Sequence, residues 1–306
     1  MKLKTACKLL ADPASRWATL PYLGLLRNVP DRKYVEEMIR RKLGYEPDLD
    51  HPTTYCEKLN WLKLHDRKPI YTVMADKYKA KQFVSERIGA AHVVPLYGVW
   101  EHYGDIDFDK LPDQFVLKCN HDGGNVIVKN KAEINHAALR RTFEKKLRRN
   151  YFYFNREWPY KDIPPRIIAE AYIPSLGARD SVEYKLTCCN GVVKMITVCT
   201  GIAHDSFDAR NNDHFDKDWN RYNFYAYYKP SGKEIKRPAE MDDMIRFAEI
   251  LSADVPCLRV DFYVADGKIY FGEMTFYTWA GFIEFTPPEW DRKMGDWIQL
   301  PDEQNP

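Results

Sequence analysis

The most informative stretch of this chain covers residues 259–275, RVDFYVADGKIYFGEMT. Two runs rich in β-branched and aromatic residues flank the dipeptide Asp266-Gly267, which is a strong signal for a tight turn between antiparallel strands. The stretch therefore predicts a β-hairpin. Three charged residues, Arg259, Asp261 and Glu273, occupy positions where a buried strand would be apolar.

The faces on which these charges lie depend on the length of the turn. A two-residue loop would place Asp261 and Glu273 on opposite faces, because successive strand residues alternate between faces. A three-residue loop that ends at Gly267, in the left-handed region, would pair Asp261 with Phe271 and Arg259 with Glu273. We expect the three-residue loop, because it leaves one face free for the core. That face would carry Leu258, Val260, Phe262, Tyr270 and Met274, and the other would carry Arg259, Asp261, Glu273 and Thr275.

Two carboxylates beside an arginine at the ends of paired strands have two interpretations. They can form a site for a hard divalent metal and a phosphate, because carboxylate oxygens bind such metals and arginine binds phosphate. Alternatively, Arg259 and Glu273 form a cross-strand ion pair while Asp261 lies on a solvated face. The hairpin by itself leaves both open.

The composition narrows the class of protein. A chain of 306 residues can form one large domain or two smaller ones. Its 46 lysines and arginines nearly balance 44 aspartates and glutamates, so no overall charge favours nucleic acid as a partner. The seven scattered cysteines include no C-x-x-C pair, which favours free thiols and a cytoplasmic location.

The N-terminal segment does not have the pattern of a signal peptide or a spanning helix, because Asp12, Pro13 and Arg16 interrupt its apolar run. Residues 17–26 could contact a membrane surface beside the preceding lysines, but packing on the domain is the favoured interpretation. We therefore expect at most peripheral membrane contact, and the sequence does not indicate an oligomeric state.

Hydrophobic periodicity predicts an α+β protein, with helices first and mixed strands and helices afterwards. The expected helices cover 31–43, 53–65, 73–88, 132–149 and 239–251. The expected strands before the last hairpin cover 93–100, 114–118, 125–129, 166–173, 184–189 and 192–199, and 203–223 is read as a polar stretch.

Several charged residues stand out in this pattern. Lys118 ends a strand and enters a loop with Gly123 and Gly124, whose backbone amides could wrap phosphate oxygens. Glu170 lies in an otherwise apolar strand and needs a partner, since an unpaired buried carboxylate is costly. P-loop, dinucleotide-binding, zinc-protease and nucleophile-elbow motifs are absent. The triplets 107–109 and 216–218 fit the D-x-D pattern of glycosyltransferases, although such triplets are frequent by chance.

Taken in order, the motifs resemble those of the TupA-like branch of the ATP-grasp superfamily, from about Asp31 to Leu300. They are EKLNWLK (57–63), ADKY (75–78), LPDQFVLKCNHD (111–122), REWPY (156–160), PRIIAE (165–170), RVDFY (259–263) and YFGEMTFY (270–277). The resemblance implies a helical N-terminal region (1–75), a first α+β lobe with a phosphate lid (76–173) and a second lobe with a magnesium site (174–306), which clasp ATP between them.

The resemblance also implies roles for individual residues. Lys77 and Lys118 would contact ATP phosphates, the loop from Asn120 through Gly123 and Gly124 would be the lid, and the backbone of Glu170, Ala171 and Ile173 would read adenine. Glu183 would hold the ribose hydroxyls and Lys185 would face the triphosphate. Asp261, Glu273 and Thr275 would bind Mg²⁺, and Arg259 would neutralise the transferred phosphoryl group. Two positions depart from the usual pattern, since Thr275 stands where ligases of the superfamily have Asn, and Thr278-Trp279-Ala280-Gly281 replaces a Pro-Gly-Ser-Gly-like turn.

The implied activity is that of an ATP-dependent carboxylate–amine ligase. Its partners would be a uronic-acid carboxylate of a glycan precursor, for surface polysaccharide biosynthesis, and an amino acid or small amine. Arg210 is a candidate for binding the acceptor carboxylate, with a surface salt bridge as the alternative. A glycan kinase on the same scaffold, a non-catalytic nucleotide-binding module and a glycosyltransferase are the competing interpretations.

Overall fold

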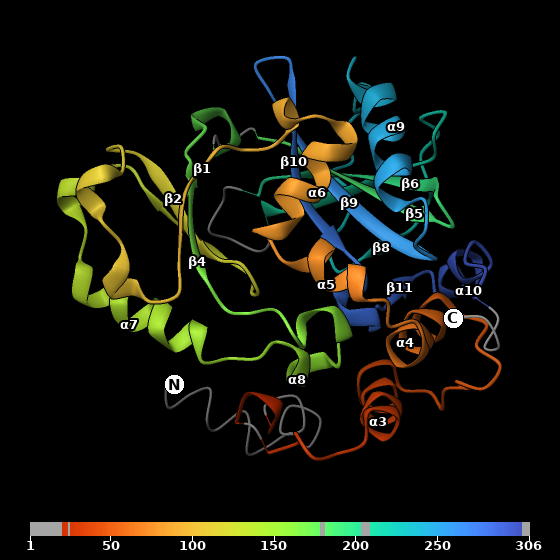
Figure 1. Cartoon of the computed structure of the whole chain (residues 1–306). Helices are drawn as coiled ribbons and strands as arrows, with labels where there is room; N and C mark the ends of the chain where they lie inside the picture. Colours follow the sequence, from red (N-terminus) through yellow and green to blue (C-terminus); the bar gives the residue numbers. More distant parts are fainter. Residues whose placement is uncertain (1–19, 24, 178–180, 203–208, 302–306) are drawn as a thin grey trace.

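A computed structural model describes residues 20–23, 25–177, 181–202 and 209–301. They form two larger β-sheets and one short two-stranded sheet, with helices around them (Figure 1). The segment 17–26, for which packing on the domain was favoured over contact with a membrane surface, lies partly outside the described residues. Within those residues, no helix is both long enough and apolar enough to cross a membrane.

Four helices open the described chain, and two of the three predicted ones are confirmed. They are α3 (Asp31–Leu43), α4 (Tyr55–His65), α5 (Pro69–Ala75) and α6 (Lys79–Ile88). The single helix predicted over 73–88 is wrong, because the chain breaks at Asp76. Its Oδ1 accepts hydrogen bonds from the backbone N–H groups of Tyr78 and Lys79, which ends one helix and caps the next.

The first sheet has four antiparallel strands in the order β1-β4-β2-β3, with α7 along one side (Figure 1). Their bounds are β1 (Leu96–Trp100), β2 (Phe115–Cys119), β3 (Asn125–Val128), β4 (Ile167–Ala171) and α7 (His136–Leu147). The short α8 (Phe152–Asn155) precedes β4. The chain then crosses to the second sheet.

The second sheet has five antiparallel strands in the order β10-β9-β5-β6-β7. Their bounds are β5 (Glu183–Cys189), β6 (Val192–Thr200), β7 (Asn211–Phe215), β9 (Cys257–Ala265) and β10 (Lys268–Thr275). Helix α9 (Met241–Ser252) packs on one face of this sheet. The short strands β8 (Tyr225–Ala226) and β11 (Phe285–Thr286) and the helix α10 (Glu289–Gly295) contribute residues to the same hydrophobic core. Strand β7 was not predicted, because its sequence NNDHF is almost entirely polar.

Each sheet has its own hydrophobic core. The first core joins Phe115 and Ile167 of the sheet to Phe143 of α7. The second joins sheet residues such as Phe262 to α9, α4 and α5, and it also includes Phe83 and Val84 of α6. Helix α6 therefore packs with the second lobe, although the predicted boundary at residue 76 placed it in the first.

The register of the final hairpin differs from the predicted one. The turn has two residues, Asp266 and Gly267, both with positive φ (53° and 71°), so Ala265 pairs with Lys268. The extra residue lies instead at Gly272, where the pairing shifts between Phe271 and Glu273. A Cβ at Gly272 would lie 2.9 Å from a Tyr263 ring carbon and 3.1 Å from the Asp261 carbonyl oxygen, so the close approach needs glycine.

This bulge produces the shared charged face by a different route. Asp261 pairs directly with Glu273, and Arg259 pairs with Thr275. The bulge also exchanges two aromatic residues: Phe271 is buried in the core, whereas Tyr270 pairs with Tyr263 on the other face. The core position predicted for Tyr270 is therefore wrong, and the prediction that the four polar residues share a face is confirmed.

Replacing Gly267 with valine should lower the free energy of unfolding by about 1–2 kcal/mol, because a β-branched residue would be forced to a φ of +71°. Chemical denaturation measures the change. The control is Lys268→Val, next in the chain and exposed at the start of β10, which should change stability little. Equal stability of the two variants would contradict this turn geometry.

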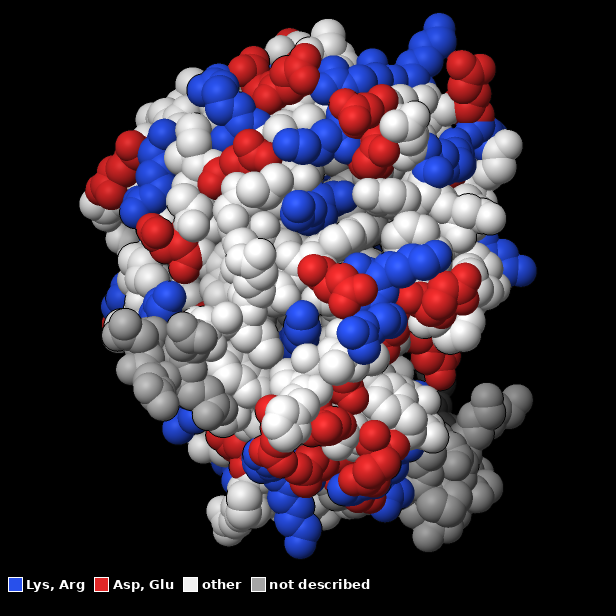
Figure 2. All heavy atoms as spheres, turned by 90° about the vertical axis from the view of Figure 1, so that its right-hand side faces the viewer, with Lys and Arg blue, Asp and Glu red and all other residues white. Residues whose placement is uncertain are grey.

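The state of the cysteines and the distribution of surface charge are two further features on which the sequence bears. The six cysteines within the described residues are buried and free, as predicted, and Cys7 lies outside the described residues. On the face shown in Figure 2, lysine and arginine side chains are interspersed with aspartate and glutamate.

Candidate active site

A row of polar residues crosses the second sheet from edge to edge. Direct cross-strand pairing joins one residue from each of the five strands, so all five side chains share one face of the sheet. In strand order from β10 to β7, the row is Glu273, Asp261, Lys185, Thr197 and His214.

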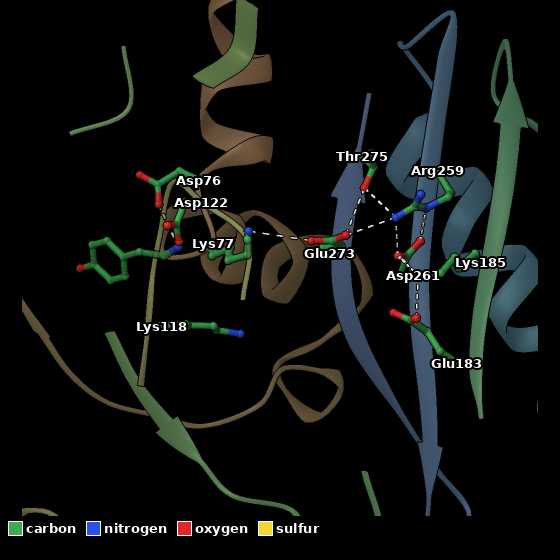
Figure 3. A network of polar contacts seen from close by, with 12 residues as sticks. Asp76, Lys77, Lys118, Asp122, Glu183, Lys185, Arg259, Asp261, Glu273 and Thr275 are labelled. Carbon is green, nitrogen blue, oxygen red and sulfur yellow. Dashed lines mark hydrogen bonds and ion pairs between the residues drawn. The ribbon is translucent and has the colours of Figure 1, made fainter. Parts of the chain in front are cut away.

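The three predicted metal ligands converge on one atom, Nη2 of Arg259. This nitrogen donates to Asp261 Oδ2 at 2.8 Å, to Glu273 Oε1 at 3.2 Å and to Thr275 Oγ1 at 3.0 Å (Figure 3). A positively charged group therefore lies where two carboxylate oxygens and a hydroxyl oxygen meet. Oxygen donors of this kind suit Mg²⁺, which keeps several waters and needs only one or two carboxylates, so the residues present fit the ion.

The described residues contain no group of three or more His, Cys, Asp or Glu side chains that could hold a metal. Asp261 is fully buried, whereas the Glu273 side chain is 40% exposed. The alternative that Asp261 lies on a solvated face is therefore wrong, although the cross-strand ion pair of that alternative is present.

Charge compensation keeps Asp261 ionised despite its burial. Burial raises the pKa of Asp261, but Arg259 and Lys185 more than offset this, so the pKa lies below its usual value. Lys185 Nζ lies 2.8 Å from Asp261 Oδ2 and 2.6 Å from Glu183 Oε2. Burial lowers the pKa of Lys185, and the attraction of Asp261 reverses this and raises it. Both groups are therefore charged at neutral pH.

The first lobe supplies a second charged cluster around Glu170. Lys118 Nζ lies 2.5 Å and Lys81 Nζ 2.6 Å from its two oxygens. Burial raises the pKa of Glu170, but the two lysines together lower it below the usual value. The partner that Glu170 was predicted to need is thus a pair of lysines, and Glu170 holds Lys118 in place.

Lys77 connects the two lobes. Its Nζ lies 3.8 Å from Glu273 Oε2 (Figure 3). Its backbone N–H donates to the carbonyl of Asn120. Asn120 itself is fully buried. Its amide donates to Asp76 Oδ1 and accepts from the backbone N–H of Arg166, so it positions the lobe connection. The Asn120 side chain therefore has a structural role, and its predicted cofactor contact stays a prediction.

Parts of the predicted lid and hinge form hydrogen bonds within the protein. Lys146 of α7 donates to the carbonyl of Gly123 at 2.8 Å and pairs with Asp122, and Gly124 has a φ of +82°. The backbone N–H of Ala171 donates to the carbonyl of Pro95, so this N–H is not available to adenine. A backbone N–H that binds adenine would therefore not be that of Ala171, and the other hinge contacts stay predictions.

Replacing Lys118 with alanine should weaken ATP binding about tenfold, because a charge-assisted contact to a phosphate is lost. Isothermal titration calorimetry with a non-hydrolysable ATP analogue measures the affinity. Lys131→Ala is the control, since this lysine binds the carbonyl of Leu111 away from the Glu170 cluster. Equal affinities of the wild type and Lys118→Ala would exclude Lys118 from the site.

A cavity of about 320 Å³ adjoins the charged row on the second sheet. Glu183, Lys185 and Arg259 line it, and Arg210 does so from the start of β7. Glu183 is engaged on both oxygens, since Tyr263 donates its hydroxyl at 2.6 Å and Lys185 pairs with the other. The remaining lining includes Thr197, His214, Phe224, Tyr228, Trp279 and Phe285.

Arg210 contacts the hydroxyl of Tyr228 at 3.5 Å and forms no ion pair with the residues described. The surface salt bridge considered as an alternative is therefore not seen among the residues described. Arg210 and Arg259 both line the cavity, and the binding of an acceptor carboxylate by Arg210 stays a prediction.

The unusual turn at residues 278–281 is strained and firmly held. Trp279, Ala280 and Gly281 all have positive φ. Non-glycine residues rarely adopt such values, so the backbone is strained at Trp279 and Ala280. Lys63 Nζ donates to the carbonyl of Ala280 at 2.5 Å, and the amide of Asn60 donates to that of Gly281 at 2.7 Å. Helix α4 thus fixes a turn that places Trp279 in the wall of the cavity.

Lys63 is completely buried, with Asn60 Oδ1 and the carbonyls of Asn155 and Ala280 as acceptors. Burial lowers the pKa of Lys63 to about 7, against the attraction of Glu157. Three acceptors match the three N–H bonds of an ammonium group, and Nζ also lies 4.4 Å from the ring centre of Phe282. These contacts favour the charged form.

The two D-x-D triplets have structural roles. The Asp107 side chain accepts from the backbone N–H of Asp109, and Asp216 accepts from the N–H groups of Asp218 and Asn220. Both side chains cap local turns.

Three residues of the site were not predicted. Lys81 follows Lys77 by four residues, and the need of Glu170 for a cation could have identified it. Lys63 lies in the quoted EKLNWLK motif, but its partner carbonyls are more than 90 residues away. His214 could have been found only by recognising the polar strand β7.

Comparison with known proteins agrees with this geometry. Residues 57–299 match the model of the family described as TupA-like ATPgrasp. The chain belongs to the TupA-like ATP-grasp family. The predicted ATP-grasp fold of this TupA-like chain is thereby confirmed. A search of curated proteins finds no match.

Two ligases are among the solved structures to which the chain is similar at low identity. D-alanine–D-alanine ligase from Bacillus anthracis, complexed with ATP, is 19% identical over 67% of this chain and 54% of its own, with a TM-score of 0.39. The L-amino acid ligase from Bacillus licheniformis is 14% identical over 87% of this chain and 56% of its own, with a TM-score of 0.41. The TupA-like chain thus spans little more than half the length of these proteins.

Proposed function

We propose that this protein is an ATP-dependent ligase that joins a carboxylate to an amine with release of ADP and phosphate. The single observation that carries this is the convergence of Asp261, Glu273 and Thr275 oxygens on Arg259 Nη2, beside a cavity with room for a second substrate. Phosphoryl transfer depends on positioning and charge neutralisation, and this cluster provides both.

The reaction would proceed in two steps. An oxygen of the substrate carboxylate attacks the γ-phosphorus of ATP, ADP leaves, and an acyl phosphate forms. The amine nitrogen then attacks the acyl carbon, loses its proton and displaces inorganic phosphate, which leaves an amide.

The residues of the cluster would divide this work. Asp261, Glu273 and Thr275 would hold Mg²⁺, which when bound would neutralise charge on the phosphates. Arg259 Nη2 would turn from these oxygens to the transferred phosphoryl group, and Lys185 would hold the triphosphate. Lys77 and Lys118 would contact phosphates from the first lobe, and Arg210 would bind a carboxylate in the cavity.

We further propose that the carboxylate substrate is a uronic acid of a glycan precursor and that the amine is an amino acid or small amine. The mixture of hydroxyl groups and aromatic rings in the cavity supports a sugar, because aromatic side chains pack against sugar rings while polar groups bind hydroxyls.

A product assay tests the reaction. ADP release is measured with a panel of uronic acids, with and without a panel of amines, and the products are identified by mass spectrometry. If the protein is a ligase, each ADP released should be accompanied by one amide and one inorganic phosphate. A phosphorylated sugar without phosphate release would identify a kinase instead, and the absence of ADP formation with every pair would contradict the proposal.

A further inference from the structure

His214 holds an unused polar atom in the wall of the cavity. Its Nδ1 lies 2.9 Å from Thr197 Oγ1, and its ring stacks on Phe224 with centres 4.4 Å apart and an angle of 4° between the planes. These contacts fix the ring. The other nitrogen, Nε2, is buried and has no hydrogen-bond partner among the described residues.

A buried polar atom without a partner is unfavourable, and most such atoms in native proteins are satisfied. The residue is 5% exposed, and it lines the cavity that adjoins Arg259 and Lys185. A bound molecule in that cavity can therefore supply the missing hydrogen bond.

The protonation state of His214 restricts which chemical group of the bound molecule can form a hydrogen bond with Nε2. Burial lowers the pKa of His214 to about 4, so the imidazole is neutral near pH 7. Thr197 can donate to Nδ1 or accept from it, so Nε2 is either a donor or an acceptor. A hydroxyl group satisfies both cases because it can donate and accept, whereas a carboxylate could only accept and an ammonium could only donate.

The surroundings of His214 extend this pattern. Thr187, Thr197, Thr200 and Asn212 line the same cavity and supply hydroxyl and amide groups. Trp279 also lines the cavity and contributes an aromatic surface. Several hydroxyl-binding groups around an aromatic surface suit a polyhydroxylated ring.

We propose that His214 is a ligand contact, and that its Nε2 forms a hydrogen bond with a ring hydroxyl of a sugar-acid substrate. The substrate carboxylate would point along the polar row toward Arg259. This inference rests on the proposed function for the identity of the substrate, but the ligand contact itself can be tested without turnover.

Calorimetry with chosen probes tests the contact. D-glucuronate, D-galacturonate and D-mannuronate supply ring hydroxyls, and cyclohexanecarboxylate has a ring and a carboxylate without them. All are titrated into the full chain with Mg²⁺ and a saturating non-hydrolysable ATP analogue. The wild type should bind at least one uronate more tightly than cyclohexanecarboxylate, and His214→Phe should weaken that uronate about tenfold with no change for cyclohexanecarboxylate.

Two further variants separate a ligand contact from a structural role. His214→Phe keeps the ring stack but removes Nε2 and the hydrogen bond between Nδ1 and Thr197, so its thermal unfolding temperature should fall only slightly. His214→Gln restores a polar group near the position of Nε2 and should recover part of the uronate affinity. His92→Phe is the matched control, because His92 also packs on a phenylalanine, Phe247, but bonds the Ile269 carbonyl and does not line the cavity.

Three outcomes would overturn the proposal. They are an absence of preference for any uronate over cyclohexanecarboxylate, unchanged uronate affinity in His214→Phe, and an equal loss in His92→Phe. If His214→Phe instead weakens the ATP analogue titrated alone, the hydroxyl belongs to its ribose and the substrate contact is also excluded. Uronate binding that depends on His214 without any ADP formation would refute the proposed reaction and leave the ligand contact standing.

Discussion

Glu273→Gln should reduce ATP-dependent turnover about 1,000-fold, because a carboxylate that would hold Mg²⁺ is lost and such an ion contributes several kcal/mol to the stabilisation of transition-state charge. The fold should be retained. The Glu273 side chain is 40% exposed, and its ion pairs with Arg259 and Lys77 are 3.2 and 3.8 Å long. Ion pairs at exposed positions contribute little to stability. ADP release over a range of Mg²⁺ concentrations and thermal unfolding measure the two effects.

The matched control for this variant is Glu249→Gln. Glu249 lies on α9, is similarly exposed at 33%, and pairs with Lys217 at 3.7 Å. Its replacement removes the same charge outside the site and should leave turnover unchanged. Retention of turnover and of the Mg²⁺ dependence in Glu273→Gln would exclude Glu273 as a metal ligand.

Lys63→Met should lower the free energy of unfolding by about 3 kcal/mol, because it leaves three buried acceptors without a donor and removes one of the two cations near Glu157. The strained turn that Lys63 holds through Ala280 should also relax. Urea denaturation measures the stability. Weaker binding of the second substrate, with little change for the ATP analogue, would report the displaced turn.

Lys42→Met provides the control for Lys63. Lys42 lies over the same Phe282 ring at 4.6 Å, but the residue is exposed. A cation–π contact at such a site contributes about 0.5–1 kcal/mol, so the loss of stability should be much smaller. Equal destabilisation by the two variants would show that the buried hydrogen bonds of Lys63 do not stabilise the fold.

The sequence predicted the elements whose signals are local. The period-two pattern of 259–275 identified the last hairpin, and the spacing of apolar residues identified α3, α4 and α9. It also placed Arg259, Asp261, Glu273 and Thr275 on one face, although through the wrong turn. The prediction survived because a shift of one residue anywhere between the two carboxylates restores the same face, and the bulge at Gly272 provides that shift.

The sequence failed where local signals were weak or misleading. The polar strand β7 lacked apolar alternation, because its site-facing residues line a cavity. The break at Asp76 was hidden within a helical pattern that continues on both sides. The assignment of Asn120 to the cofactor came from its position in a motif, which gave no sign of the structural role that burial and the bonds to Asp76 and Arg166 give its side chain.

By itself, the sequence determined the α+β class, the family motifs and the four charged or polar residues of the hairpin, because these depend on residues that are close in the chain. Only the tertiary structure decided which partners they meet. The row from Glu273 to His214 requires the register of five strands, and the anchoring of the strained turn by Lys63 joins residues 217 positions apart. Such contacts form only when the chain packs, because the burial that makes them favourable does not exist in any local segment.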